Sequence, residues 1–220
     1  MEIKELIKNR HSVRQYKDTP IEEDVRVRLD ELTKEVNEES GLNIRIIYDD
    51  PECFNTFLAH YGKFKNVSNY IAIVGDKKLE NLDERAGYYG QKLVLAAQDM
   101  GLNTCWVGGT YGKGKVKIDK EKGEKIVCVI ALGYGENEGI KHKSKPVGKL
   151  CNVAEEDMPI WFKNGMVAAM MAPTALDQQR FYVTLNDDEV IITSQKAPFA
   201  KVDLGIVKYN FEAVTGRKCK

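Results

Sequence analysis

Two arginines and a serine lie close together at positions 10–14, which read Arg-His-Ser-Val-Arg. Guanidinium groups form strong, often bidentate hydrogen bonds to phosphates, and a hydroxyl group can add a further donor. If the short helix indicated by the apolar spacing of residues 3–7 continued, Arg10 and Arg14 would share one face. The string can therefore bind a phosphate and a carbonyl group, although its charge pattern alone favours a solvated basic helix end, which suits the C-terminal dipole.

A second distinctive segment lies in the other half of the chain, where positions 172–181 read Ala-Pro-Thr-Ala-Leu-Asp-Gln-Gln-Arg-Phe. Together with the string Arg-His-Ser-Val-Arg-Gln-Tyr at 10–16, it resembles the two signature segments of the nitroreductase family of FMN-dependent oxidoreductases. In ordinary members both segments lie in the first part of one chain, and two identical chains pair to build the flavin sites. Because this chain divides the segments between its halves, the resemblance implies a dimer fused into one polypeptide.

The resemblance assigns the first segment to the phosphate end and to one edge of the flavin. Arg10 and Ser12, with His11 between them, would contact the FMN phosphate and ribityl chain. Arg14 would lie near the N1–C2=O edge of the flavin ring.

A lysine and a glycine turn are assigned to the flavin ring by the same resemblance. Lys63 would face the N1–C2=O edge, where a cation stabilises the anionic reduced flavin and raises its potential, and Lys65 is an equally placed rival. Gly108 and Gly109 would let backbone N–H groups approach flavin N5, where hydride arrives. An ordinary surface lysine and an ordinary turn are the alternatives.

Further residues implied by the resemblance lie in a basic loop and in the second segment. Lys141 and Lys143 take the places of the family's Lys-x-Arg, which reaches the phosphate, and Lys143 lacks the bidentate fork of arginine. The second segment supplies Pro173, Thr174, Ala175, Asp177 and Gln179. It departs from the family's pattern, because Asp177 replaces Asn, Arg180 replaces Pro and Phe181 replaces Trp.

These assignments favour an oxidoreductase in which NADH, NADPH or a ferredoxin-like protein reduces FMN. The flavin then passes electrons to a nitro compound, a quinone or a similar small-molecule acceptor. Because the protein positions the flavin and tunes its electronics, no catalytic side chain and no metal ligand is assigned. The acid at Asp177 would repel anionic donors, which motivates the alternative of a flavin-binding protein without reductase turnover. One signature pair predicts one FMN per polypeptide, in a pseudo-dimeric monomer or a dimer of fused chains.

The composition indicates a globular protein that binds neither nucleic acid nor membranes. The 220 residues include 33 Lys+Arg and 33 Asp+Glu, whereas nucleic-acid and anionic-membrane binders carry a basic excess. No apolar run approaches the ~20 residues of a membrane span, and the N-terminus lacks the apolar core of a signal peptide. The 5 cysteines are odd in number and lack Cys-x-x-Cys spacing, which favours a reducing, cytoplasmic setting without a zinc site.

Two glycine-rich strings are incomplete as phosphate loops. Residues 109–116 read Gly-Thr-Tyr-Gly-Lys-Gly-Lys-Val, and Val116 stands where a P-loop has its Mg²⁺-binding hydroxyl. Residues 133–139 follow a strand, but their glycines have GxGxxxG spacing and no helix pattern follows, unlike a dinucleotide-binding fingerprint. A nucleotide hydrolase that uses the first string is a third hypothesis.

Apolar periodicity and turn residues predict an α+β fold without strict βαβ alternation. The predicted helices span residues 3–10, 20–36, 52–59, 84–100, 159–171 and 202–214. The predicted strands span residues 43–48, 69–74, 103–107, 125–132, 180–185 and 189–193. The chain 1–220 is predicted to form a single nitroreductase-like domain with pseudo-repeats at about 1–150 and 151–220.

A weak internal repeat agrees with the predicted duplication. Residues 90–101 can be laid on residues 205–216, because each stretch begins and ends with glycine at the same spacing and follows strand-like sequence. Two unrelated helices that both end in glycine are the alternative.

Overall fold

The computed structural model describes residues 1–141 and 143–220 and divides into two compact units. The sheet unit comprises residues 10–82 and 93–140, and the helical unit comprises residues 1–9, 83–92 and 141–220. Helix α4 (Leu82–Asp99) contributes to both units. The units are defined by compactness, so the pseudo-repeats, which rest on sequence likeness, stay a prediction.

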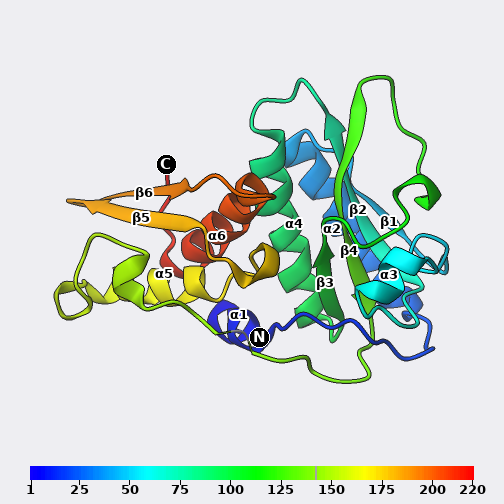
Figure 1. Ribbon diagram of the computed structural model, residues 1–220, viewed down its shortest axis with the longest axis horizontal. Helices are drawn as coiled ribbons and strands as arrows, with labels where there is room; N and C mark the ends of the chain where they lie inside the picture. The colour runs from blue at the N-terminus through cyan, green and yellow to red at the C-terminus, as the bar shows by residue number, and fades with distance from the viewer. Residues whose placement is uncertain (142) are drawn as a thin grey trace. The chain divides into compact units, whose positions relative to one another are not determined.

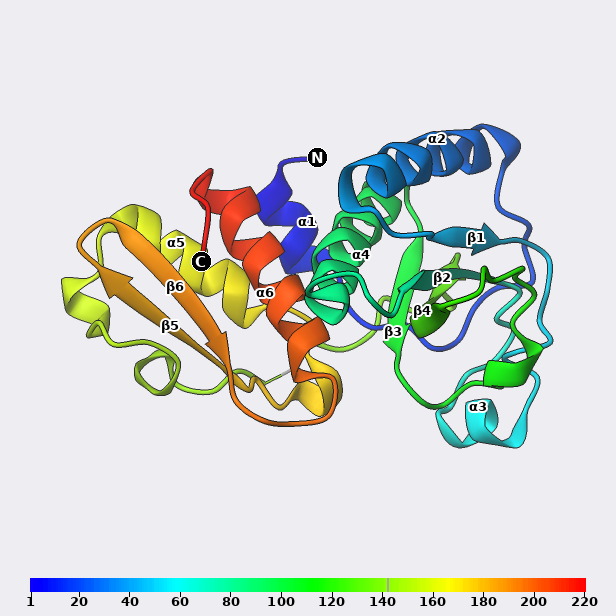
Figure 2. The ribbon, with the colours of Figure 1, turned by 90° about the horizontal axis from the view of Figure 1, so that it is seen from above.

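The sheet unit is built on four strands, each antiparallel to its neighbours (Figure 1). Their order is β1 (Arg45–Ile47), β2 (Asn69–Asp76), β4 (Glu124–Gly133) and β3 (Asn103–Val107). Every residue of β2 except Asp76 is buried, and alternate side chains point to opposite faces, so both faces of the sheet are covered. Helix α2 (Glu23–Ser40) lies on one face and α3 (Phe57–Tyr61) on the other (Figure 2).

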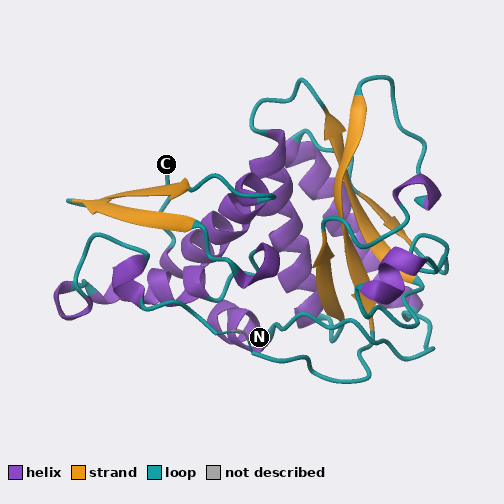
Figure 3. Ribbon diagram, viewed as in Figure 1, coloured by secondary structure: helices purple, strands orange, loops and turns teal. Residues whose placement is uncertain are grey.

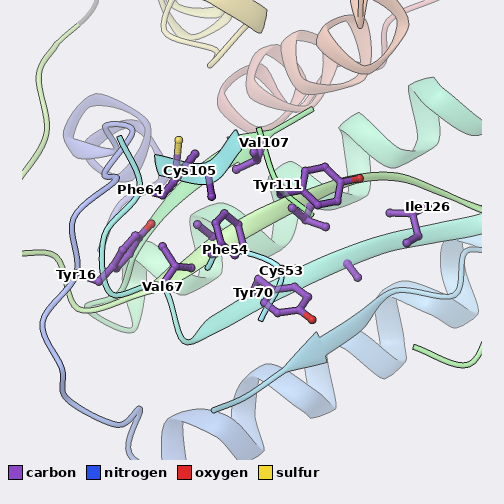
Figure 4. Packing of buried hydrophobic residues seen from close by; sticks show 14 of the residues in the cluster. Tyr16, Cys53, Phe54, Phe64, Val67, Tyr70, Cys105, Val107, Tyr111 and Ile126 are labelled. Atoms are coloured by element: carbon purple, nitrogen blue, oxygen red, sulfur yellow. The ribbon is translucent and has the colours of Figure 1, made fainter. Parts of the chain in front are cut away.

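An apolar cluster fills the α3 face of the sheet (Figure 4). Tyr70 and Ala72 of β2 point into it at alternate positions, as the two-residue period of a strand requires. The ring of Phe54 packs edge-on against Phe64, with the ring centroids 5.1 Å apart. The cluster therefore fixes the chain on both sides of α3, next to Lys63.

The helical unit combines helices with a two-stranded hairpin (Figure 3). Its elements are α1 (Ile3–Asn9), the first part of α4, α5 (Ile160–Met170), β5 (Phe181–Asn186), β6 (Glu189–Ser194) and α6 (Ala200–Thr215). Phe162 of α5 and Phe211 of α6 are fully buried, and their ring centroids lie 5.9 Å apart. These rings form part of the core of this unit.

Helices α4 and α6 cross so closely that only glycine fits on either side of the contact. A Cβ atom on Gly87 would overlap the carbonyl oxygen of Val202. A Cβ atom on Gly205 would overlap the carbonyl oxygen of Glu84. Glycine is unfavourable inside a helix because of its backbone entropy, so these two positions serve packing rather than helix formation.

The last residues of the chain return to β6 and are tied to α6 by Glu212. Its carboxylate accepts hydrogen bonds from the Tyr88 hydroxyl and from Lys218 Nζ, both at 2.7 Å, and from Cys219 N at 2.9 Å. The hydrogen bond that Lys218 donates to Glu212 raises the pKa of Lys218 above its usual range. One carboxylate therefore joins α4, α6 and the C-terminal residues within the helical unit.

We expect Glu212→Ala to lower the free energy of unfolding by about 1–2 kcal/mol, because it leaves donors without their acceptor. Urea unfolding measures the change. Glu155→Ala is the matched control, since its ion pair with Lys163 joins two side chains that are 57% and 51% exposed, and such pairs contribute about 0–1 kcal/mol. Equal losses in the two variants would contradict a structural role for Glu212.

The predicted elements are confirmed in type, and several have different ends. The helix predicted at 20–36 begins at Glu23 and continues to Ser40, because Gly41 ends it with a left-handed φ of 69°. The helix predicted at 52–59 is wrong in extent. Thr56 Oγ1 accepts a hydrogen bond from the N–H of Ala59 at 3.3 Å and caps a helix that spans only Phe57–Tyr61.

Three further observations concern membrane spans, metal sites and the state of the cysteines. No helix in the described part of the chain is both long and apolar enough to cross a membrane. Residues 1–141 and 143–220 also contain no group of three or more His, Cys, Asp and Glu side chains placed to hold a metal ion. The cysteines are free thiols, buried except for Cys219, which is half-buried.

Candidate functional site

The first signature segment is extended and lies beside the sheet. Helix α1 ends before Arg10, and Val13 N then donates to Thr104 O at 3.0 Å. Lys65 N donates to Arg14 O at 3.0 Å on the other side. These hydrogen bonds occupy the backbone groups that a continuing helix would need, so the helix does not continue and Arg10 and Arg14 do not share a helix face.

The side chains of this segment differ in exposure. Arg10 is buried, with 4% of its surface exposed. Ser12 is half-buried, and Arg14 is exposed. Val13, between them, is buried in the core of the sheet unit. Ser12, Val13 and Arg14 therefore differ in exposure from one residue to the next, as successive residues of an extended chain do.

The loop after β4 covers another side of the same segment. Glu136 N donates to Gln15 O at 2.8 Å, and His11 Nδ1 lies 3.1 Å from Glu138 O. Gly139 has a left-handed φ of 73°, and a Cβ atom there would lie 2.8 Å from His11 Cβ. This close approach requires glycine.

Lys63 lies in a left-handed turn directly after α3, with φ of 63° and an exposed side chain. A Cβ atom on Gly62 would lie 2.8 Å from Thr110 Oγ1, so this turn packs against the turn that follows β3. The Lys65 ammonium group is paired with Glu136 at 3.2 Å. Lys63 forms no ion pair with any described residue, which distinguishes the two rival lysines.

The turn after β3 is open at two glycines. Val107, the last residue of β3, is buried, whereas Gly108 and Gly109 are exposed. Nothing in the described chain lies within 4 Å of the position that a Cβ atom of Gly109 would take. A flat ligand therefore has room to approach the backbone here.

The glycine-rich string at 109–116 lacks the geometry of a P-loop. It contains only a 3₁₀ turn, Lys113–Lys115, and no helix of the described chain follows it before β4. Gly112 N donates to Cys53 O at 2.7 Å, and Lys115 Nζ pairs with Glu52 at 3.3 Å. The lysine that would bind a nucleotide phosphate is thus held by a carboxylate, and the structure does not support the hydrolase hypothesis.

The second signature segment forms a strained turn between α5 and β5. Leu176, Asp177 and Gln179 have left-handed φ values of 53°, 52° and 45°. Residues other than glycine rarely adopt this conformation, which costs of order 1–3 kcal/mol each and persists only where the surroundings enforce it. Such strain is concentrated at functional sites, so residues 174–179, called the signature loop below, are a candidate binding element.

Thr174 and Gln179 use their side chains to hold the signature loop. Gln179 N donates to Thr174 Oγ1 at 3.1 Å, and Gln179 Nε2 donates to Met170 O at 2.9 Å. Gln179 Oε1 accepts from Lys145 N at 2.7 Å. Gln179 is 1% exposed and Pro173 is buried. The exposed member of the predicted set in this loop is Asp177.

Sequence reasoning missed two residues that fasten the signature loop. Lys145 Nζ donates to the carbonyl oxygens of Gln178, at 2.5 Å, and Gln179, at 3.0 Å. Asp203 of α6, which is 6% exposed, accepts a hydrogen bond from Ala175 N at 2.9 Å through Oδ1. Burial raises the pKa of Asp203 to about 7, and the hydrogen bond from Ala175 opposes this shift. An acid within the apolar run of α6 was the signal that could have identified it.

The predicted site residues fall into two groups, one in each unit. The sheet-unit group is Arg10, His11, Ser12, Arg14, Lys63, Gly108 and Gly109. The helical-unit group is Lys141, Lys143, Pro173, Thr174, Ala175, Asp177 and Gln179. Lys141 and Lys143 are exposed and form no ion pair with a described residue.

Comparison with known proteins identifies the family. The model of a family described as "Putative TM nitroreductase" matches residues 2–215. No curated protein matches the chain. Among solved structures, a nitroreductase of Thermotoga maritima is similar over 99% of this chain and 87% of its own, with a TM-score of 0.68 and 20% identity.

Two further solved structures share the fold over part of the chain. A nitroreductase in complex with FMN, from Desulfovibrio desulfuricans, covers 68% of this chain and 94% of its own, with a TM-score of 0.52 and 20% identity. An NADH dehydrogenase/NAD(P)H nitroreductase from Parabacteroides distasonis covers 68% and 96%, with a TM-score of 0.53 and 22% identity. These structures show a mixed α and β fold of the nitroreductase type. Since the family model matches nearly the whole length, the chain belongs to the nitroreductase family.

Proposed function

We propose that this chain is an FMN-dependent oxidoreductase of the nitroreductase type. The observation that carries the proposal is the match of the family model to residues 2–215. The relative from Desulfovibrio desulfuricans contains FMN and has a similar fold, which supports FMN as the cofactor here.

The residues of the sheet-unit group fit the chemistry of FMN. Arg10 and Ser12 offer donors for a phosphate group. Arg14 and Lys63 are exposed cations that form no ion pair with a described residue, and they suit the N1–C2=O edge, which becomes negative on reduction. The open position beside Gly109 leaves space for the ring. For the helical-unit group, we retain the roles implied by the resemblance, with Lys141 and Lys143 as point charges toward phosphate.

Bound FMN would supply hydride and electron-transfer chemistry at N5. The chain's own groups would position the ring and set its electronics. The positive charges of Arg14 and Lys63 would favour the reduced form, and the backbone N–H groups at Gly108 and Gly109 would orient the N5 side. This reaction needs no side-chain acid or base from the protein.

The proposed cycle takes electrons from NADH, NADPH or a ferredoxin-like protein and delivers them to a nitro compound, quinone or similar small molecule. The relative from Parabacteroides distasonis is described as an NADH dehydrogenase/NAD(P)H nitroreductase, which supports a nicotinamide donor. Sustained oxidation of NADH or NADPH with an added quinone would establish turnover. FMN binding without turnover of any donor and acceptor would favour the alternative, a flavin-binding protein.

Helices α4 and α6 support our proposal that the chain is an internal duplication. The residue before each helix is left-handed, with φ of 55° at Asn81 and 60° at Phe199. The sixth residue of each helix is the glycine of the crossing, Gly87 or Gly205. Left-handed residues other than glycine are uncommon, so the shared cap and glycine position favour a common origin.

The contacts at the crossing follow the same correspondence. Each glycine faces the residue three positions before and the residue one position after the other glycine. Such reciprocal contacts are those of a local two-fold axis. This correspondence pairs Gly205 with Gly87. The glycine spacing in the sequence pairs Gly205 instead with Gly90, three residues further along α4.

A fused duplicate with one signature pair is expected to bind one FMN per polypeptide. The purified chain would be mixed with FMN and desalted, and the flavin would be quantified per chain from its visible absorbance. Retention near one FMN supports both the cofactor and the single site. Saturation near two FMN per chain would contradict the single site, and a colourless protein would contradict FMN binding altogether.

A further inference from the structure

The signature loop is held in its strained conformation by groups outside it. Met170 O accepts a hydrogen bond from the side-chain amide of Gln179. The Lys145 ammonium group donates to two carbonyl oxygens of the loop, and the Asp203 carboxyl group accepts from Ala175 N. The bond to Asp203 is made at the start of the loop, immediately before the left-handed residues. It is also the bond whose acceptor titrates near neutral pH.

Asp203 lies in the first turn of α6, where the helix dipole favours a negative charge. Its burial opposes that charge more strongly, because the carboxylate loses its hydration. The other charged residues of α6 and of the elements of this unit that pack against it are Lys4, Glu5 and Lys8 of α1, Asp83, Glu84, Arg85 and Lys92 of α4, Lys163 of α5, Asp177 and Arg180 of the loop region, Glu189 of β6, and Lys201, Lys208 and Glu212 of α6. Lys208 pairs with Glu84 at 2.7 Å, and among the described residues no charged side chain compensates the charge of Asp203.

We propose that Asp203 is a positioning residue for the signature loop, and that its buried carboxyl group keeps the loop closed by accepting the hydrogen bond from Ala175 N–H. Closed denotes the conformation described above, and open denotes one in which water reaches Asp203. The link to catalysis rests on the proposed function, because the loop carries residues assigned to the flavin. The conformational part does not depend on it.

The closed loop binds a proton on Asp203 more tightly than the open loop does. The carboxyl group has a pKa of about 7 when closed and returns toward the ordinary 3.8 when solvated. The closed form is therefore most favoured at low pH and loses this advantage as the pH rises through about 7. Proton linkage with these two values predicts that the ratio of closed to open loop falls about tenfold between pH 6 and pH 8.

Amide hydrogen exchange of the segment 172–180 tests this without any cofactor. After correction for the intrinsic exchange rate, we expect the protection of Ala175 N–H in the native chain to fall about tenfold from pH 6 to pH 8. Asp203→Asn keeps an oxygen acceptor but does not titrate, so its protection should stay constant. Asp203→Ala removes the acceptor and should leave this amide poorly protected at both pH values. Equal pH dependence in the native chain and in Asp203→Asn would overturn the proposal.

Two further measurements keep the test decisive. If Asp203→Asn does not fold, the amides of the β5–β6 hairpin serve as controls within the native chain, and protection that falls equally there would overturn the proposal. FMN titration then addresses function: Asp203→Ala should bind FMN more weakly, and Asp203→Asn should restore binding. If the chain binds no FMN, the proposed function fails while the exchange result still decides the role of Asp203.

Discussion

Gly205→Ala is expected to lower the free energy of unfolding by at least about 3 kcal/mol, the upper part of the range for overpacked cores. The added methyl group would overlap Glu84 O and lie 2.5 Å from Tyr88 N. Both are backbone atoms of a helix, so the overlap can be relieved only by moving α4 and α6 apart. Alanine would otherwise favour the helix by roughly 1 kcal/mol, so the sign of the effect tests the contact. Urea unfolding followed by circular dichroism measures it.

The reciprocal glycine provides a sharper test. Gly87→Ala alone should be destabilising by a similar amount, since it meets Val202 and Ile206 of the other helix. In the double variant the second alanine should cost much less than the first, because the helices have already separated. Gly148→Ala is the matched control, with nothing within 4 Å of its added Cβ atom. Additive losses in the double variant would contradict a shared contact.

This crossing illustrates what a single sequence can predict and what it cannot. Apolar periodicity and the glycines at 101 and 216 predicted both helices to within two residues at each end. The glycine spacing aligns Gly205 with Gly90, whereas the proposed duplication pairs it with Gly87, because spacing alone cannot distinguish a glycine that serves packing from one that does not. The packing role of Gly87 can be recognised only when the residues that it contacts, 115 or more positions away in the sequence, are known.

The candidate site shows the same limit. Residue types at 10–16 and 172–181 are sufficient to indicate the family, which the family model confirms. The extended path of the first segment depends on Thr104 and Lys65, which the local pattern does not contain. Asp203 was likewise missed, because its partner is a backbone N–H in a distant loop. Local patterns predicted the chemical groups, whereas long-range hydrogen bonds determine how they are presented.

Arg10→Ala is expected to weaken FMN binding by about 1.5–3 kcal/mol, the loss for a hydrogen bond to a charged group. This corresponds to an increase in Kd of roughly tenfold to a hundredfold. Because Arg10 is 4% exposed, its removal can also disturb the fold, and thermal unfolding of the variant must accompany the titration. Arg28→Ala, an exposed arginine on α2 in the same unit, controls for a general loss of positive charge.

Riboflavin, which lacks the phosphate, separates the roles of the two arginines in the first segment. If Arg10 binds phosphate, Arg10→Ala should weaken FMN but leave riboflavin affinity nearly unchanged, so the preference for FMN should largely disappear. Arg14→Ala should weaken both flavins equally, because its proposed contact is with the ring that they share. Equal losses for both flavins in Arg10→Ala would place Arg10 away from the phosphate. That outcome would also exclude Arg10 as the residue that distinguishes FMN from riboflavin.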